Sequence, residues 1–446
     1  MVCSRYLASQ QAPHKSHLIM AQHQSSQDAP SIAVVGGGIA GVLLTIALLK
    51  HCPQFPVTLY ESASAFGEIG AGVGFQPVMV RTMALIDPRI AVAFEHCIKG
   101  NEETDPPVWF TVRVGDTRKK GVAIDDEVFK IPGREGPRGG VHRAHFLAEL
   151  VKLIPDGVAR FGKRVIDVTS TENGDAMLHF ADGSTAQHAA VLGCDGIKSR
   201  IRPIVLADSD PAPAVFSGKY AYRGLVPMDR AVEIMGGDEI RTPQMNLGYH
   251  GHVLTFPIAG GKILNVVAFS SRPTWEDSNW TVHTSKEDML KDYEHWSPKV
   301  REIMENVQSP DIWALFNHPP ASIYYRLDPL VCLVGDAAHA STPHQGAGAG
   351  MCVEDAYILS QVLARCRVKG DFKLAFKAYD AVRRPRSQKL VKTSKEAGQL
   401  WDLEGEGIGD DLEAFEKDAT TRMSWIWDHD ISVDLKRAHD TMSDSR

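Results

Sequence analysis

The sequence predicts an α/β fold in which a Rossmann-type dinucleotide-binding domain is interrupted by a mixed or antiparallel β-sheet domain and followed by C-terminal helices. Three observations predict this fold. A β-branched strand, a glycine-rich turn and a helix follow one another over residues 31–50. Two further apolar strands, at 189–192 and 330–334, each lead into a turn that contains glycine and aspartate. Between these strands, residues 212–320 alternate apolar and polar side chains, as in a half-buried sheet.

Length and composition limit the class of protein. The chain has 446 residues, 43% of them hydrophobic and 23% charged, which excludes a disordered or fibrous protein and allows two or three domains. A net charge of -7 at pH 7 disfavours nucleic acid and anionic membranes as partners. Seven cysteines, widely spaced and without a C-x-x-C pair, predict a reducing compartment, no disulfide framework and no metal site.

Two segments near the amino terminus bear on location. Residues 32–49 are almost uncharged, near the lower limit for a membrane span, but the glycines inside them favour a strand, a turn and a helix. Residues 1–30 contain no long apolar block, which disfavours a secretory signal peptide. We therefore expect a flexible tail on a cytoplasmic protein without a membrane segment. The alternative for this acid-poor tail is a mitochondrial transit peptide.

The turn after the first strand has the pattern of a dinucleotide site. Residues 36–41 match G-x-G-x-x-G, and the next strand ends in Glu61, twenty residues past Gly41. Gly36 makes the tight turn, Gly38 lets the backbone approach a pyrophosphate, and Gly41 lets the helix pack closely on the strand. Glu61 is placed to accept hydrogen bonds from a ribose diol, which disfavours NADP here. This motif alone leaves FAD and NAD open.

Two later motifs distinguish these dinucleotides. The strand at 189–192 leads into Gly193-Cys-Asp195-Gly196, and a later strand leads into Gly335-Asp336. A glycine-rich loop at 346–350 then begins another helix. A plain NAD dehydrogenase needs neither Asp336 nor this loop.

The order of these motifs resembles that of the class A flavoprotein aromatic hydroxylases, from residue 31 to about residue 430. Within that class the chain is most similar to the salicylate hydroxylases (salicylate 1-monooxygenases). The resemblance implies an FAD-binding domain, NADH or NADPH and O₂ as co-substrates, a small aromatic substrate, and a monomer or a homodimer. The stretches that carry it are 66–73, 221–224, 242–245, 252–257, 265–269 and 335–350.

Domain boundaries follow from the motifs and the resemblance. The long helix near the C-terminus, from Phe372 to Gly398, is expected to break near Pro385. The expected segments are a flexible tail at 1–30, FAD-binding parts at 31–105 and 141–211, a loop or substrate-side insertion at 106–140, a substrate domain at 212–320, a third FAD-binding part with the long helix at 321–398, and a helical cap at 399–446.

The resemblance also implies roles for single residues around FAD. Glu61 binds the adenosine ribose, Arg143 lies near the ribityl and pyrophosphate portion, and Asp336 accepts from a ribityl hydroxyl. Asp195 serves the pyrophosphate and NAD(P)H docking. The alternative role of Asp195 is that of a helix N-cap, and the alternative for Arg143 is a surface ion pair. The loop at 346–350 brings backbone N–H groups to the N1–C2=O edge of the isoalloxazine. The expected cofactor-binding residues are Gly36, Gly38, Gly41, Glu61, Gly70, Ala71, Arg143, Asp195, Gly335, Asp336, Gly348 and Ala349.

The resemblance assigns two catalytic residues. Arg223 supplies a cation that stabilises a phenolate or carboxylate, with a buried structural ion pair as the alternative. His344, at the flavin edge, moves a proton or hydrogen-bonds the leaving hydroxide. The related fungal dearomatising hydroxylases have a tyrosine where this chain has Phe256, which disfavours a dearomatising reaction. A structural role is the alternative for His252. The expected pocket walls are Tyr222, His252, Phe256 and Pro343.

The expected reaction is hydroxylation of a phenolic acid ortho to its hydroxyl, by way of a C4a-hydroperoxyflavin. Where the attacked carbon carries a carboxylate, CO₂ leaves, so salicylate becomes catechol. One alternative is a hydroxylase of another hydroxybenzoate or of a polyketide phenol. A more remote alternative is a non-catalytic protein-binding module on the FAD fold.

Overall fold

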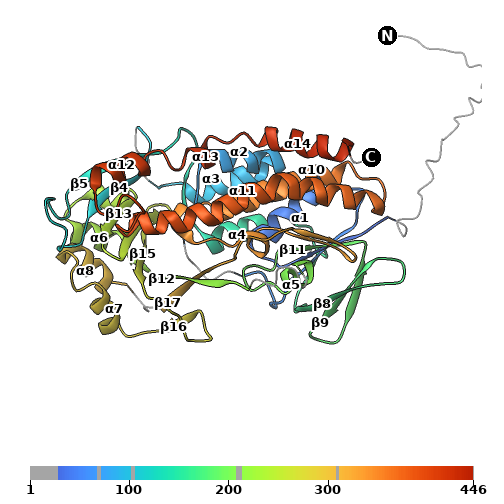
Figure 1. Ribbon diagram of the computed structural model, residues 1–446, viewed down its shortest axis with the longest axis horizontal. Coiled ribbons are helices and arrows are strands. Elements are labelled where there is room, and N and C mark those ends of the chain that lie inside the picture. The colour runs from blue at the N-terminus through green and yellow to red at the C-terminus, as the bar shows by residue number, and fades with distance from the viewer. Residues whose placement is uncertain (1–28, 68–71, 102–105, 207–212, 308–310, 445–446) are drawn as a thin grey trace, which may run out of the picture.

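Figure 1 shows the computed structural model of the chain, which describes residues 29–67, 72–101, 106–206, 213–307 and 311–444. The expected tail at 1–30 lies almost wholly outside the described residues, and Gly70 and Ala71 lie outside them too. Two large sheets dominate the fold, and the long helix α11 (Phe372–Trp401) runs along the molecule past both.

The first sheet is that of a Rossmann-type domain. Its strands lie in the order β18-β19-β11-β1-β2-β7, and all neighbours are parallel except β18 and β19. The central strands are short, fully buried apolar runs, as parallel strands covered on both faces require. Because β1, β2, β11 and β19 point the same way, the loops that follow them meet at one edge. The strands are β1 (Ile32–Val35), β2 (Val57–Tyr60), β7 (Ala159–Arg160), β11 (Ala190–Gly193), β18 (Tyr325–Leu327) and β19 (Leu330–Leu333).

Helices and two small sheets complete this domain. The helices α1 and α10 pack on one another and on the sheet, and α11 and α14 cover α10 (Figure 1). The helices are α1 (Ile39–His51), α2 (Pro77–Ile86), α3 (Pro88–Ile98), α4 (Arg143–Val151), α5 (Ile201–Leu206), α9 (Asp336–His339), α10 (Gly348–Ala364) and α14 (Ile431–Asp444). The small sheets pair β3 (Gly72–Phe75) with β6 (Gly139–His142), and β9 (Ala176–Phe180) with β8 (Val165–Ser170) and β10 (Thr185–His188).

The second sheet has the order β16-β17-β12-β15-β14-β13-β4-β5 and is antiparallel except between β13 and β4. Residues 108–132 thus add two strands to this sheet and do not form only a loop. One face packs under α6 (Met228–Met235), α7 (Lys286–Asp292) and α8 (Pro298–Glu305). The strands are β4 (Val108–Val114), β5 (Glu127–Pro132), β12 (Val215–Pro227), β13 (Gln244–Gly248), β14 (Gly251–Ile258), β15 (Ile263–Ser271), β16 (Thr281–His283) and β17 (Asp311–Asn317).

The break expected near Pro385 is wrong, because α11 continues through this residue. The fully buried guanidinium of Arg383 lies 2.7 Å from Glu354 and 2.9 Å from Asp355, both in α10. Arg386, on the other side of the proline, lies 2.8 Å from Glu354. These ion pairs hold α11 against α10 on both sides of the proline, which by itself costs a helix about 3 kcal/mol.

The expected fold class is confirmed by the two sheets and their order. The helical segment after α11 adds α12 (Leu412–Ala419) and α13 (Ser424–Trp427) ahead of α14. Within the described ranges, no helix has both the length and the apolar character needed to cross a membrane.

Candidate active site

Close backbone contacts fix the first glycine turn against the end of β11. Gly36 has a φ of +106°, and a Cβ there would lie 2.4 Å from the carbonyl oxygen of Cys194. A Cβ on Gly41 would lie 1.9 Å from the carbonyl oxygen of Gly36. Only glycine therefore allows α1 to begin this close to β1, as a dinucleotide turn requires.

Glu61 directly follows β2 and contacts this turn. Its carboxylate accepts hydrogen bonds from the backbone N–H of Gly37 at 2.6 Å and of Ala63 at 2.7 Å, and from the Ser62 hydroxyl at 3.0 Å. The Gly37 contact holds the acid beside the glycine turn. An acidic acceptor in this position suits the diol of an adenosine ribose.

The turn at Gly335 packs on both of the neighbouring helices. Its φ is +63°, and a Cβ there would lie 2.9 Å from the Cβ of Ala40 in α1 and 3.0 Å from Sγ of Cys352 in α10. Asp336 follows in the same turn, so it lies near the amino-terminal ends of both helices. Gly348 and Ala349 form the first turn of α10. Neither helix has an acidic residue in its first turn, which leaves its positive end available to an anion.

Asp195 serves as a cap in the described structure. Its carboxylate accepts from the Ser199 hydroxyl at 2.6 Å and from the backbone N–H groups of Arg200 at 2.6 Å and Ile201 at 3.2 Å. Burial raises the pKa of this carboxyl. Asp195 lies six residues before the first residue of α5, so it is not the N-cap residue itself, but its carboxylate binds N–H groups at that end of the helix as a cap would. Its direct contact with FAD stays a prediction.

Arg223 lies on the face of the second sheet that looks toward the Rossmann-type domain. Its guanidinium carbon lies 4.9 Å from the ring centroid of Trp313. Its Nε is buried and has no hydrogen-bond partner among the described residues. Burial, and then the nearby charge of Arg143, lower the pKa of Arg223. The side chain is still a cation at neutral pH, held beside an aromatic ring and near a second arginine.

Phe256, in β14, stands at the seam between the two domains. A Cβ on Gly72 in β3, or on Gly140 in β6, would lie 2.6 Å from its ring. Asn265, on the neighbouring strand, accepts from the backbone N–H of Gly72 at 3.1 Å. Two glycines thus make room for the phenyl ring, whose packing needs no hydroxyl.

His344 lies in the short helix η3 (Pro343–Gln345), directly after the exposed Pro343. The centroid of its ring lies 4.8 Å from that of Phe269 and 5.4 Å from that of His252. Both ring nitrogens are buried and have no hydrogen-bond partner in the part of the chain that the structure describes. Burial, and then the neighbouring His252, hold the pKa of His344 well below its ordinary value, so the imidazole is neutral at neutral pH.

His252 belongs to a buried polar network. Its ring stacks on Phe269 with centroids 4.2 Å apart, and its Nδ1 lies 2.6 Å from Oδ1 of Asp402. Asp402 also forms an ion pair with Lys219, and the side chains of His252 and Asp402 are fully buried. Burial lowers the pKa of His252 although Asp402 acts to raise it. Lys219 and Asp402 belong to no sequence motif that points to the site.

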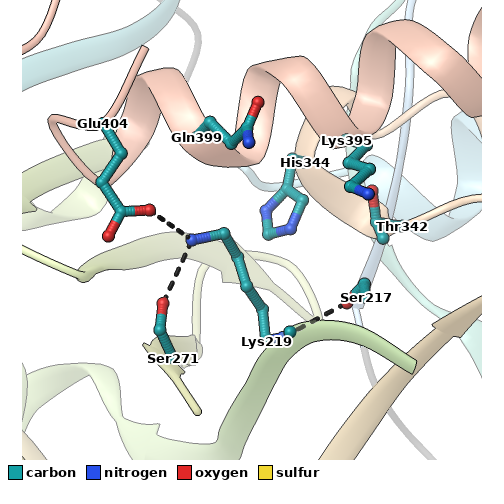
Figure 2. Close-up of a pocket in the computed structure, with 9 residues that line it drawn as sticks. Ser217, Lys219, Ser271, Thr342, His344, Lys395, Gln399 and Glu404 are labelled. Atoms are coloured by element: carbon teal, nitrogen blue, oxygen red, sulfur yellow. Dashed lines mark hydrogen bonds and ion pairs between the residues drawn. The ribbon is translucent and has the colours of Figure 1, made fainter. Parts of the chain in front are cut away.

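A cavity of about 160 Å³ lies beside this network, between β12 and the C-terminal part of α11 (Figure 2). In Figure 2 the His344 ring lies beside the Lys219 side chain, whose Nζ turns toward Ser271 and Glu404. Nζ lies 3.1 Å from the Ser271 hydroxyl and 3.2 Å from Glu404. The lining residues are Ser217, Gly218, Lys219, Ser271, Thr342, His344, Lys395, Gln399 and Glu404.

The expectation that Tyr222 lines the pocket is wrong. Side chains alternate along β12, so Tyr222 points to the face under α6, α7 and α8, whereas Arg223 points to the opposite face. The hydroxyl of Tyr222 donates to Asp292 at 2.7 Å. Burial raises the pKa of Tyr222, so it stays a neutral part of this second core. The parity of the strand was the signal that separates these two neighbours.

The fold and its converging turns define a class, that of proteins binding a dinucleotide next to a second, substrate-side sheet. The glycine turns, which have no space for a Cβ, the acid after β2 and the two helix N-termini all fit FAD. In the part of the chain that the structure describes, no cluster of side chains suits a metal ion.

Comparison with known proteins narrows the class. The FAD binding domain family matches residues 284–394. A salicylate hydroxylase of Pseudomonas putida is 39% identical over 422 residues, which cover 91% of this chain and 94% of that protein. The 6-methylsalicylate 1-monooxygenase atA of Aspergillus terreus is 38% identical over 420 residues, which cover 93% of this chain and 92% of that protein.

A solved structure agrees with these relatives. The chain matches a salicylate hydroxylase substrate complex with a TM-score of 0.81 and 32% identity, over 92% of this chain and 98% of that one. The chain therefore belongs to the FAD-dependent aromatic monooxygenases of the salicylate hydroxylase family. The expected enzyme class and the expected FAD cofactor are confirmed.

Proposed function

We propose that this monooxygenase converts a 2-hydroxybenzoate into a catechol, with salicylate as the first candidate. One atom of O₂ bonds to the ring carbon that carries the carboxylate, the carbon–carbon bond breaks, and CO₂ leaves. The other oxygen atom becomes water, with two electrons from NADH or NADPH and two protons. Bound FAD supplies the redox chemistry between the pyridine nucleotide and O₂.

The cation of Arg223 is the observation that carries this proposal. Its Nε lacks a hydrogen-bond partner among the described residues, and the neighbouring charge of Arg143 makes an anion favourable there. A 2-hydroxybenzoate brings a carboxylate and, after deprotonation, a phenolate. Either group gains charge-assisted hydrogen bonds from a guanidinium that has already lost part of its hydration. Arg223 therefore binds and orients the substrate.

His344 is suited to receive the proton of the substrate hydroxyl. Its imidazole is neutral and buried, with both nitrogens free of hydrogen bonds in the described chain. Deprotonation turns the phenol into a phenolate, which pushes electron density onto its ortho carbon. A general base at this position thus prepares the ring for attack on an electrophilic oxygen.

Apolar side chains around Arg223 exclude water from the reacting ring. Arg223 pairs across the sheet with Val267, which pairs with Leu254, so the three share one face. Phe256 extends this face toward Gly72 and Gly140. A dry, apolar surface around one cation strengthens that cation's hold on an anion.

The cofactor contacts follow the same proposal. Glu61 accepts from the adenosine ribose, and Asp336 accepts from a ribityl hydroxyl. The backbones of Gly36, Gly38 and Gly41 face the pyrophosphate, with Arg143 nearby, while Gly348 and Ala349 present N–H groups to the isoalloxazine. Asp195 holds its loop in the shape that this arrangement needs.

A substituted 2-hydroxybenzoate is the second candidate, because a relative of similar identity is named for 6-methylsalicylate. A panel of salicylate, 6-methylsalicylate, 3-hydroxybenzoate and a neutral phenol separates the candidates. We expect the FAD-loaded enzyme to oxidise NADH or NADPH faster with a 2-hydroxybenzoate, with catechol or a methylcatechol as the product. If no phenol on the panel accelerates that oxidation, the hydroxylase proposal is wrong.

A further inference from the structure

A chain of ionisable side chains connects the buried network at His252 with solvent. Asp402 binds His252 Nδ1 at 2.6 Å and forms an ion pair with Lys219. Lys219 Nζ lies 3.2 Å from Glu404, which in turn contacts His250. Exposure rises along this chain, from 0% for the His252 and Asp402 side chains to 9% for Lys219, 32% for Glu404 and 69% for His250.

The inner end of the chain meets His344. The two imidazole rings lie 5.4 Å apart between centroids, and Nε2 of His252 and both nitrogens of His344 lack partners among the described residues. A ring rotation or one water molecule spans such a separation. Phe269 packs on both rings.

Burial keeps the two imidazoles neutral, although the charge of Asp402 acts to raise the pKa of both. Burial lowers the pKa of both rings, and Lys219 acts in the same direction. Burial acts to raise the pKa of Asp402, but His252 and Lys219 lower it below its ordinary value. The ionisable groups that face this region are Lys219 from β12, His250 from the turn before β14, Tyr293 after α7, Lys395 from α11, and Asp402 and Glu404 after α11.

A second buried pair in the molecule shows what a purely structural arrangement looks like. His339 and Asp355 also lie 2.6 Å apart with fully buried side chains. Asp355, however, binds the Arg383 guanidinium and the backbone N–H of Gly335. Among the described residues, its contacts continue outward only through Arg383. Burial acts to lower the pKa of Arg383, but Glu354 and Asp355 raise it, so this guanidinium keeps its proton. The network at Asp402 continues instead through a lysine, which can both give and take a proton, to exposed groups. It begins at His344, whose two ring nitrogens have no hydrogen-bond partner among the described residues.

We propose that His252, Asp402, Lys219 and Glu404 form a proton relay that carries the proton of the substrate hydroxyl from His344 to solvent. This inference rests on the proposed function, since it needs a phenolic substrate at His344. It adds to that function the route by which the proton leaves a dry site, in which the substrate itself blocks direct access of water.

The proton count along the relay balances. His344 takes the hydroxyl proton on one nitrogen and releases one from the other to Nε2 of His252. His252 releases its Nδ1 proton to Asp402, which passes it to Lys219 as the lysine gives a proton to Glu404. Glu404 releases that proton to solvent. One proton leaves the site, each group regains its charge, and no electrons move.

The cavity beside His344 offers the rival route. It contains polar lining groups and is large enough for water, which would take the proton directly from His344 without the buried network. The relay and the rival route make different predictions for Asp402, which does not line the cavity. Only the relay requires that carboxylate for rapid proton release.

Stopped-flow mixing of the FAD-loaded enzyme with salicylate, in weak buffer containing a pH-indicator dye, tests the relay. We expect wild-type enzyme to release one proton as fast as salicylate binds, over a broad range of pH. Asp402→Asn should slow proton release at least about tenfold, while the Kd for salicylate stays within about twofold. In His252→Ala, added imidazole should restore the rate, because a small base can occupy the vacated space.

Two further variants keep the test independent of folding. Lys219→Met combined with Asp402→Asn removes both buried charges, so it leaves no unpaired ion that would destabilise the fold. Asp182→Asn removes the partner of a lysine in a remote hairpin, 2.7 Å from Lys163, and should leave proton release unchanged. Proton release at the wild-type rate in the double variant would overturn the relay. Failure of wild-type enzyme to bind salicylate or any phenol on the panel would instead overturn the proposed function itself.

Discussion

Gly41→Ala is the substitution that tests the dinucleotide turn most severely. The added Cβ would lie 1.9 Å from the carbonyl oxygen of Gly36, whereas real Cβ atoms essentially never approach within 3.0 Å of another heavy atom. Helix α1 must therefore move away from the turn by about 1.1 Å, or the turn must open by the same distance. Both changes disturb the backbone that we propose to face the FAD pyrophosphate.

The size of the effect follows from that displacement. Overpacking a well-packed site costs about 1–3 kcal/mol, and a backbone carbonyl yields less than a side chain does. The upper part of this range, about 2–3 kcal/mol, corresponds to about a 30- to 150-fold increase in the Kd for FAD. The fold should survive, because the substitution removes none of the buried apolar side chains of α1.

The assay is a titration of apoprotein with FAD, followed by the change in flavin fluorescence, with circular dichroism as a check of folding. Gly370→Ala, in the short helix η4 (Lys369–Asp371), is the matched control, because a Cβ there meets no atom within 4 Å. Gly335→Ala is a second test, since its Cβ would meet Ala40 and Cys352 and its φ is positive. A folded Gly41→Ala protein that binds FAD as tightly as wild type would refute the reasoning.

Three further predictions concern the substrate, the domain seam and a buried ion pair. Arg223→Met should weaken salicylate binding by about 2 kcal/mol or more, about 30-fold in Kd, with FAD binding unchanged, as ligand titration would show. Phe256→Ala should lower the free energy of unfolding by about 2 kcal/mol, less than for a fully buried phenylalanine, in urea denaturation. Asp355→Asn should lower it by about 3–5 kcal/mol at pH 7. Burial acts to raise the pKa of Asp355, but His339 and Arg383 lower it below its ordinary value of 3.8. The loss of unfolding free energy in Asp355→Asn should therefore shrink as the pH falls below 3.8.

Each of these predictions has an outcome that contradicts it. Unchanged salicylate affinity in Arg223→Met would show that the cation does not bind the substrate anion. An unchanged unfolding midpoint in Phe256→Ala would mean that the ring contributes nothing at the seam. A stability gap for Asp355→Asn that stays constant between pH 7 and about pH 2.5 would disprove the assigned pKa shift.

Local sequence patterns were enough to predict the Rossmann-type sheet and its turns. The strand, glycine turn and helix at β1 and α1 are consecutive in the chain, and Glu61 lies only 24 residues from Gly37. Glycine positions are informative because the backbone allows no other residue where a Cβ would meet a carbonyl oxygen. The glycines at 36–41 therefore predict the close approach of α1 to β1 from the sequence alone.

Contacts between distant segments were beyond sequence reasoning. Lys219 and Asp402 are 183 residues apart, and His252 and Asp402 are 150 apart, with no shared motif or period that connects them. The continuous α11 likewise depends on ion pairs with α10, which override the local effect of Pro385. The placement of Tyr222, in contrast, could have been predicted from the sequence. Neighbouring residues of a strand point to opposite faces of the sheet, so Tyr222 and Arg223 cannot both face the pocket.

The most direct test of the proposed function is turnover of salicylate under ¹⁸O₂ with NADH and the FAD-loaded enzyme, followed by mass spectrometry of the product. We expect catechol that carries one ¹⁸O atom, together with one CO₂ released for each catechol formed. Oxidation of NADH that yields only hydrogen peroxide, with salicylate recovered unchanged, would contradict the proposed reaction.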